Sequence, residues 1–419
     1  MKDQQASYPQ LRFKGFTDPW EERKLSSISE RVTRKNKNNE STLPLTISAQ
    51  DGLVDQNDFF NKQVASRDVT GYFLVKNGEF AYNKSYSNGY PWGAIKRLDK
   101  YDMGVLSTLY IVFRPTKINS QFLVSYYDTT RWYREVSKNA AEGARNHGLL
   151  NIAPTDFFNT LLVVPKIVDE QQKIGSFFKQ LDDTITLHQR KLAKLKELKQ
   201  GYLQKLFPRN GSKFPQLRFA GFADAWEQRK LSDIATLNAR IGWQNLRTSE
   251  FLESGDYMLI TGTNFHDGTV DYSTVHYVEK NRYEQDTKIQ VENGSILITK
   301  DGTLGKVALV QGLNMPATLN AGVFNVKIKD PETIDVDYVY QYLAAPFLMK
   351  YANAKSTGGT IKHLNQNILI DFPVLLPRKR EQVKLAELLN GLDNTITLHQ
   401  RTLEKLQELK KGYLQKMFC

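Results

Sequence analysis

The chain has little cysteine and no long apolar run, and each absence excludes a class of protein. Its 419 residues include a single cysteine, Cys419, so neither a disulfide framework nor a thiolate metal site is available. No run of about 18 apolar residues occurs, which excludes a membrane-spanning helix. The first ten residues, MKDQQASYPQ, lack the apolar core of a secretory signal. These absences predict a cytoplasmic protein.

The motifs of nucleotide-dependent and metal-dependent enzymes are also missing. The segment GTLGKV is the nearest approach to a phosphate-binding loop, but two residues separate its glycines and Val307 follows Lys306. The sequence has no glycine-rich dinucleotide loop, no Asn-Pro-Pro-aromatic tetrad for holding a flipped base and no H-E-x-x-H pair. Its six histidines are scattered. The sequence therefore indicates a binding protein, with a nuclease of unrecognised active site as the alternative.

The charge and apolar content favour a folded protein with a polyanionic partner. Hydrophobic residues make up 40% of the chain, which is enough for real cores, and the length suggests two to four domains. The formal net charge of +12 and the pI of about 9.3 favour nucleic acid as a partner. The alternative is that the lysines only keep the protein in solution.

The chain is an internal duplication. The lead-in YPQLRFKGFTDPWEERKLS, from Tyr8, returns as FPQLRFAGFADAWEQRKLS, from Phe214. The segment LDDTITLHQRKLAKLKELKQGYLQKLF, from Leu181, returns as LDNTITLHQRTLEKLQELKKGYLQKMF, from Leu392. A period this long indicates duplicated domains rather than a solenoid. The predicted segments are a lead-in (1–25), a first globular domain (26–165), a central spacer helix (166–208), a second lead-in (209–231), a second globular domain (232–377) and a C-terminal spacer helix (378–419).

The two globular domains are predicted to share a mixed α/β (α+β) fold. Strand-like runs include SILIT, VALV, VFNVKI and YIVF, separated by Asn-Gly and Asp-Gly turns. Residues 339–348 have helical spacing, interrupted by Pro346. The stretch KNGEFAYNKS in the first domain aligns with ENGSILITKD in the second, so Lys84 corresponds to Lys300. Both domains close on a short apolar strand, LLVVPK and VLLPRK.

The repeated helical segments carry the pattern of a coiled coil. Apolar residues recur at alternating spacings of four and three, which defines a helix-pairing seam. We predict that the two long helices pair antiparallel through this seam. The seam residues are Phe178, Leu181, Ile185, His188, Leu192, Leu195 and Tyr202, and in the second copy Leu389, Leu392, Ile396, His399, Leu403, Leu406 and Tyr413.

The histidine of each TITLHQR repeat is predicted to be structural. His188 and His399 both fall on the seam, where a buried polar group sets helix register at some cost in stability. Lys199 and Lys410 fit the same role. Two histidines without a third ligand make a poor metal site, so no metal is expected. Whether the histidines meet each other, meet seam lysines or face a partner is left open.

Candidate ligand-binding residues of the second domain lie in two segments. SILITKDGTLGKVALV, residues 295–310, predicts two strands joined by a polar turn whose tip could meet phosphates or base edges. STGGTIKHL, residues 356–364, adds glycines for close backbone approach. An ordinary basic hairpin is an equal alternative for the first segment. The candidates are Lys300, Asp301, Thr303, Lys306, Thr360, Lys362 and His363.

The first domain offers two further segments, YNKSYSNGYPWG and EGARNHG. Arginine is the usual bidentate partner of guanine and asparagine that of adenine, although a structural loop is nearly as well supported for any single residue. Arg131, Trp132 and Arg134 are equally well explained by a helix face. The candidates are Lys84, Ser85, Tyr86, Asn88, Arg145, Asn146 and His147.

The arrangement resembles the DNA specificity (S) subunit of type I restriction–modification systems along essentially the whole chain. The resemblance is carried by both lead-ins, by GARNHGLLNI, by GSILITKDGTLGKVALV and GTIKHLNQ, and above all by the two helical segments. It implies two target-recognition domains, each reading one half of a bipartite, asymmetric DNA sequence, with antiparallel helices that set the gap.

The resemblance also implies partners and a division of labour. Two modification (methyltransferase) subunits would carry S-adenosylmethionine, and restriction subunits would carry ATP and Mg²⁺, while this chain would bind no cofactor and catalyse nothing. Helix residues outside the seam are expected to bind the modification subunits. The alternatives are a self-contained DNA methylase or nuclease and a coiled-coil scaffold; the first lacks its motifs, and the second leaves two large divergent domains unexplained.

Overall fold

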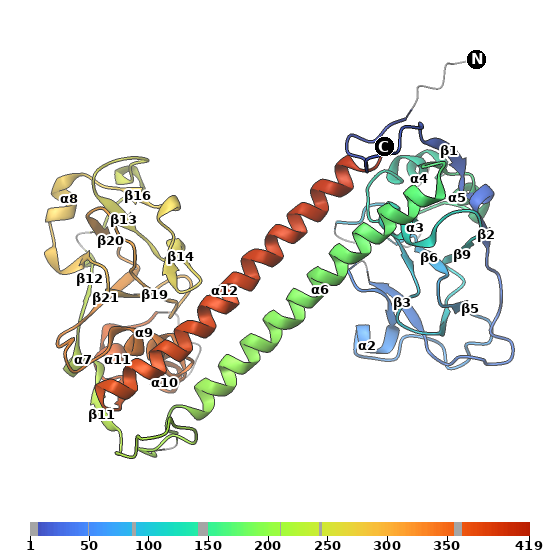
Figure 1. Ribbon diagram of the computed structural model, residues 1–419. Helices are drawn as coiled ribbons and strands as arrows, with labels where there is room; N and C mark the ends of the chain where they lie inside the picture. The colour runs from blue at the N-terminus through green and yellow to red at the C-terminus, as the bar shows by residue number, and fades with distance from the viewer. Residues whose placement is uncertain are drawn as a thin grey trace. The chain divides into compact units, whose positions relative to one another are not determined.

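The computed structural model contains two compact units (Figure 1). Unit 1 comprises Met1–Gln189 and Thr402–Cys419, and unit 2 comprises Arg190–Arg401. Each of the two long helices has residues in both units. The structure describes residues 7–48, 50–85, 89–140, 150–209, 211–242, 245–355 and 363–419.

Domain 1, residues 26–165 of unit 1, is built on a four-stranded antiparallel sheet in the order β2-β9-β6-β7. Two further antiparallel pairs are β3-β4 and β5-β8, and β1, which lies in the lead-in before the domain, pairs with β10. The strands are β1 (Glu21–Lys24), β2 (Ser29–Arg31), β3 (Leu45–Ser48), β4 (Gly52–Asp55), β5 (Phe73–Lys76), β6 (Phe80–Asn83), β7 (Ala94–Arg97), β8 (Met103–Leu106), β9 (Ile111–Pro115) and β10 (Leu161–Val164). The helices are α1 (Leu25–Ile28), α2 (Gln56–Phe60), α3 (Ser120–Tyr127), α4 (Tyr133–Asn139) and α5 (Pro154–Phe158).

Domain 2, residues 232–377 of unit 2, contains a six-stranded sheet in the order β12-β21-β18-β19-β15-β14 and a four-stranded sheet in the order β16-β13-β20-β17. β11 pairs with β22. The strands are β11 (Glu227–Lys230), β12 (Ala235–Ala239), β13 (Met258–Ile260), β14 (Phe265–His266), β15 (Thr269–Val270), β16 (His276–Tyr277), β17 (Gln290–Val291), β18 (Ile296–Thr299), β19 (Val307–Leu309), β20 (Ala317–Leu319), β21 (Val323–Ile328) and β22 (Pro373–Leu376). The helices are α7 (Leu231–Ile234), α8 (Lys280–Glu284), α9 (Val336–Ala344), α10 (Phe347–Lys355) and α11 (Gln366–Ile370), with 3₁₀ turns η2 (Thr248–Glu250), η3 (Gly262–Asn264), η4 (Tyr272–Thr274) and η5 (Thr287–Ile289).

The strand order confirms that the two domains share one fold. The order β2-β9-β6-β7 in domain 1 corresponds to β12-β21-β18-β19 in domain 2, and β1-β10 corresponds to β11-β22. The predicted strands SILIT, VALV, VFNVKI and YIVF are β18, β19, β21 and β9, and the predicted break at Pro346 separates α9 from α10. Lys84 directly follows β6 as Lys300 directly follows β18, so the predicted correspondence of these two lysines is confirmed.

The central strands β6 and β18 are buried on both faces. Ile296 and Ile298 pack in one hydrophobic cluster of domain 2, whereas Leu297 packs in another. In domain 1, Phe80 and Tyr82 of β6 likewise pack in one hydrophobic cluster and Ala81 packs in another. Successive side chains of a strand point to opposite faces, so a strand covered on both sides needs apolar residues throughout. This explains the unbroken apolar runs in the sequence.

The two long helices are α6 (Val168–Lys205) and α12 (Lys379–Lys416). In unit 1 the ring of Phe177 lies 5.1 Å from that of Tyr413, and Lys410 pairs with Asp182. In unit 2 Lys199 of α6 pairs with Asp393 of α12. Residue numbers rise along one helix as they fall along the other, so the helices run antiparallel within unit 1, as the sequence predicts.

A buried ion pair anchors each lead-in to the start of a long helix. Arg12 binds Glu170 of α6 through two hydrogen bonds of 2.6 and 2.8 Å, and Arg218 binds Glu381 of α12 in the same way. Both carboxylates are almost fully buried. The carboxylate raises the pKa of the Arg12 guanidinium further above its usual value. The repeated lead-in is therefore a structural clamp, a role that the sequence did not reveal.

Candidate functional site

The tip between β18 and β19 is shaped by a buried threonine and two glycines. The Thr299 hydroxyl donates to the carbonyl of Thr303 and accepts from the backbone N–H of Lys306 at 2.9 Å. Gly302 and Gly305 adopt φ of +72° and +71°, which side chains rarely tolerate. At Gly305 a Cβ would lie 2.1 Å from the sulfur of Met349. The tip therefore has a defined backbone on which its polar side chains are displayed.

The four candidate residues of this tip differ in their surroundings. Asp301 and Thr303 are exposed. The ammonium of Lys300 lies 5.8 Å from the ring centre of Phe324. Lys306 instead donates its ammonium to the backbone carbonyl of Phe265, so this side chain also holds the tip against β14.

The structure brings the second candidate segment of domain 2 to the same tip. The N–H of Leu364 donates to the carbonyl of Lys300 at 3.0 Å, and the Nδ1 atom of His363 lies 2.5 Å from a carboxylate oxygen of Asp301. The predicted candidates Thr360 and Lys362 lie outside the described residues. Two segments about 60 residues apart in sequence thus form one polar surface.

Domain 1 joins its two candidate segments by the equivalent bond. The N–H of Leu150 donates to the carbonyl of Lys84 at 3.0 Å, as Leu364 does to Lys300. Lys84 is half-buried, and burial lowers the pKa of its ammonium. Ser85 is tied by its N–H to the side chain of Asn83 at 3.0 Å. The remaining candidates of this domain lie outside the described residues: Tyr86, Asn88, Arg145, Asn146 and His147.

A cleft of about 910 Å³ lies in unit 1 between domain 1 and the last turns of α12. Its walls include Tyr90, Arg131, Tyr133, Lys411 and Gln415. Arg131 donates to the backbone carbonyl of Gln415 at 2.9 Å, while its neighbour Trp132 is buried. Arg131 therefore connects the domain to the helix, whereas Trp132 donates its indole N–H to the carbonyl of Tyr127 within the domain.

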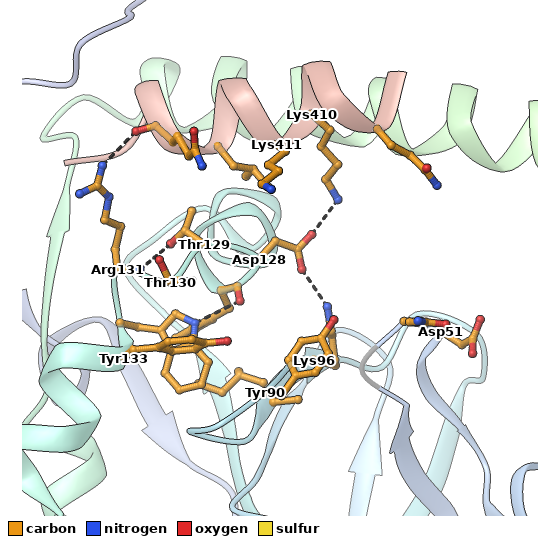
Figure 2. Close-up of a pocket in the computed structure, with 18 of the residues that line it drawn as sticks. Asp51, Tyr90, Lys96, Asp128, Thr129, Thr130, Arg131, Tyr133, Lys410 and Lys411 are labelled. Atoms are coloured by element: carbon orange, nitrogen blue, oxygen red, sulfur yellow. Dashed lines mark hydrogen bonds and ion pairs between the residues drawn. The ribbon is translucent and has the colours of Figure 1, made fainter. Parts of the chain in front are cut away.

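A chain of alternating charges crosses this cleft. Asp128 lies between Lys96 and Lys410, at 2.8 and 2.9 Å (Figure 2). Lys410 also pairs with Asp182 at 2.7 Å. Burial alone would raise the pKa of Asp128, but the two ammonium groups outweigh burial and hold this pKa below its usual value. Likewise, the two carboxylates outweigh burial and raise the pKa of Lys410. The predicted register role of Lys410 thus extends to the position of domain 1, through two residues that the sequence did not single out.

Unit 2 has a smaller cleft at the corresponding position, of about 590 Å³. Gln200, Leu203 and Gln204 of α6 line this cleft, and their repeat counterparts Lys411, Leu414 and Gln415 line the cleft of unit 1. Lys199, the counterpart of Lys410, pairs with Asp393 at 2.6 Å, and Asp393 also accepts from Gln341 of α9 at 2.7 Å. The duplication therefore creates two similar clefts.

The residues of the predicted seam are all buried or half-buried. Phe178, Ile185 and Leu389 are buried. The other predicted seam residues are half-buried, namely Leu181, His188, Leu192, Leu195, Tyr202, Leu392, Ile396, His399, Leu403, Leu406 and Tyr413. Most residues between them on α6 are exposed, including Lys191, Lys194, Lys196 and Glu197.

A second, outward stripe of each helix carries exposed leucines, each one residue before a seam position. Leu187 and Leu409 lie in unit 1, and Leu198 and Leu398 lie in unit 2. They are 60%, 49%, 45% and 65% exposed respectively. Lys194 and Lys405 are exposed on the same stripes. We refer to these six residues as the outer stripes; they lie outside the predicted seam.

Within the described ranges, no cluster of three or more His, Cys, Asp or Glu side chains is arranged to hold a metal ion. Over those same ranges, no helix has the length and apolar character needed to cross a membrane.

Comparison with known proteins identifies relatives of both repeats. A family model described as type I restriction modification DNA specificity domain matches residues 18–197 and 223–408. The type I restriction enzyme MjaVIII specificity subunit of Methanocaldococcus jannaschii is 22% identical over 63% of this chain, and the match covers 62% of that relative.

Two solved structures are similar over nearly the whole chain. The S subunit of a type I restriction-modification system from M. genitalium has a TM-score of 0.62 at 15% identity, covering 98% of this chain and 99% of that one. A chain from work on complex assembly and conformational transition of the type I R-M system has a TM-score of 0.51 at 17% identity, covering 95% and 97%. At these identities the likeness shows the fold.

Proposed function

The chain belongs to the type I restriction–modification DNA specificity family, and we infer that it is the non-catalytic, DNA-reading subunit of such a complex. The observation that carries this inference is the repeated polar surface at the ends of β6 and β18. Equivalent backbone bonds hold Lys84 to Leu150 and Lys300 to Leu364, while the residues that follow Lys84 and Lys300 in the sequence differ. One fold that occurs twice with two different sets of polar residues suits a DNA target of two unlike halves.

The electrostatics of the chain support a DNA partner. A net charge of +12 favours a polyanionic partner. Lys84 and Lys300 directly follow the central strands β6 and β18, at corresponding positions of the two domains. Phosphate contacts would position each domain, and contacts with base edges would specify sequence. Each domain would then read one half of a bipartite site.

The long helices would set the gap between the halves and bind two modification subunits. The outer stripes place one exposed leucine from each helix in each unit, and Lys405 and Lys194 lie beside them in units 1 and 2. Two similar surfaces in one chain fit two copies of one partner. S-adenosylmethionine would bind to those subunits, and ATP and Mg²⁺ to restriction subunits that complete the complex.

Methylation mapping with a domain exchange tests the proposal. The chain is co-expressed with its modification subunits, and the methylated motif is read across a genome. We expect one bipartite motif, and exchange of residues 26–165 for those of a relative should change one half only. An exchange that altered both halves, or neither, would refute one-domain-per-half recognition.

The purified chain alone provides the test of its non-catalytic role. Incubation with DNA, S-adenosylmethionine and Mg²⁺ should give neither methylated nor cleaved product, whereas adding the modification subunits should restore methylation. Product formed by the chain alone would favour the alternative of a self-contained methylase or nuclease.

A further inference from the structure

Asp301 and His363 form an exposed pair at the tip of domain 2. Their side chains are 46% and 71% exposed, and Nδ1 of the imidazole lies 2.5 Å from Oδ1 of the carboxylate. An exposed ion pair contributes little to stability. The pair is therefore more informative about what the tip presents to a ligand than about how the domain folds.

A carboxylate has a restricted choice of partners in a DNA interface. Phosphates repel it, because both groups are anionic and both only accept hydrogen bonds. In the major groove the donors are the exocyclic amino groups of cytosine and adenine. An aspartate displayed on a DNA-reading surface is thus suited to a base edge rather than to the backbone.

The bond to Asp301 also fixes the hydrogen-bonding character of His363. A carboxylate can only accept, so Nδ1 of the imidazole carries the shared proton. The carboxylate oxygen of Asp301 that does not bind His363 offers an acceptor, which matches an amino donor and is repelled by the O6 and N7 acceptors of guanine.

The backbone holds both residues in place. Lys300, which precedes Asp301, accepts the backbone bond from Leu364, which follows His363. Thr299, fully buried, fixes the turn through its bonds to Thr303 and Lys306. A base-reading group needs such support, because discrimination depends on positions accurate to a fraction of an ångström.

We propose that Asp301 and His363 are the base-reading pair of domain 2: Asp301 accepts from the free amino hydrogen of adenine or cytosine in one half-site, and His363 holds the carboxylate in position. Lys300 beside them supplies a phosphate contact. The proposal rests on the proposed function, since it specifies how one domain reads its half of the target.

Binding to base-substituted DNA tests the pair in the complex with modification subunits. The probes are duplexes that carry the mapped motif. In each probe one base pair is replaced within the half assigned to domain 2, which is the half that stays the same when residues 26–165 are exchanged. Asp301→Asn and His363→Ala should reduce discrimination at one position of that half about tenfold, as expected for loss of a specific base contact. Discrimination in the other half should stay unchanged.

Two control variants separate base reading from general effects. Asp371→Asn breaks another exposed ion pair of the same unit, with Lys230, and should leave discrimination unchanged. Lys300→Ala should weaken binding to all probes alike and reduce the salt dependence by about one phosphate contact.

The outcomes distinguish the two levels of inference. If the wild-type complex showed no bipartite motif, the proposed function itself would fail. If the motif were present but Asp301→Asn and His363→Ala weakened all probes equally, or none, the pair would only tie the tip together and the base-reading proposal would be overturned.

Discussion

At the scale of single residues, Asp128 links domain 1 to the helix α12 within unit 1 through two ion pairs. It follows α3 and accepts from Lys96 of β7 and Lys410 of α12. Replacing it with asparagine would leave two partly buried ammonium groups with weaker partners. We expect Asp128→Asn to lower the free energy of unfolding of unit 1 by about 2 kcal/mol at neutral pH, as for hydrogen bonds to charged groups.

The effect of Asp128 should depend on pH in a defined direction. The pKa of Asp128 is lowered in the folded chain, so its stabilisation is present above the unfolded pKa of about 3.9 and is lost as pH falls through the folded value. Denaturant unfolding at several pH values should show the difference between wild type and Asp128→Asn shrinking below about pH 4. A difference that persisted at lower pH would contradict this origin.

Asp183→Asn is the matched control for this network. Asp183 is next to Asp182 on α6 but pairs with exposed Lys179, one turn away on the same helix. Such a pair contributes about 0.5 kcal/mol or less. The control variant should therefore unfold almost as the wild type does at every pH.

Sequence patterns predicted local features at this scale better than tertiary ones. The seam positions, Lys199 and Lys410 follow from a heptad spacing that any helix converts into a stripe. The sequence did not indicate the pairing of Asp128 with Lys96. Asp128 caps the end of α3 and Lys96 lies on the earlier strand β7, and no periodicity in the sequence relates two such positions. The pairing of Asp301 with His363 likewise depends on sheet order, although both residues were candidates individually.

At the scale of elements, the long helices have two distinct faces. The predicted seam residues are buried or half-buried, while the outer stripes expose leucines at repeated positions. A helix that presents apolar residues on a second face has surface suited to a protein partner. The sequence predicted the elements themselves well, since β18, β19 and β21 are short, largely apolar runs next to glycine-containing turns. It did not predict their order in the sheet, which is set by contacts distant in sequence.

Charge reversal on the outer stripes should release modification subunits in steps. Lys405→Glu in unit 1 and Lys194→Glu in unit 2 each place a carboxylate beside exposed leucines, and we expect each to weaken one docking surface at least tenfold, about 1.4 kcal/mol. The double variant should release both copies. Native mass spectrometry of co-purified complexes would give the stoichiometry.

Lys196→Glu is the control for the outer stripe. Lys196 is also exposed on α6 but lies just after a seam position rather than just before one, so its reversal changes the charge equally on another face. Full stoichiometry in the double variant Lys194→Glu with Lys405→Glu would count against the outer stripes as the docking surface, and loss of partner in Lys196→Glu would indicate a general charge effect.

At the scale of the whole molecule, the duplication divides the work between divergent domains and similar helices. Both helices have residues in both units, so their length is available as a ruler for the gap between half-sites. One heptad added to each helix, after Gln189 and after Arg401, lengthens each by about 10 Å at 1.5 Å per residue. Heptad spacing keeps the seam continuous. The mapped motif should keep both halves and have a longer gap, by roughly three base pairs at 3.4 Å each.

A heptad added to α6 alone tests whether the gap between the half-sites is set by both paired helices or by the length of one helix. The insertion would leave α12 seven residues shorter than its partner, so pairs such as Lys410 with Asp182 and Lys199 with Asp393 could not both keep their register. Each such pair bridges the two helices, and we expect the single insertion to abolish methylation while the double insertion retains it at the longer gap. A double insertion that methylated the original motif would show that something other than helix length sets the spacing.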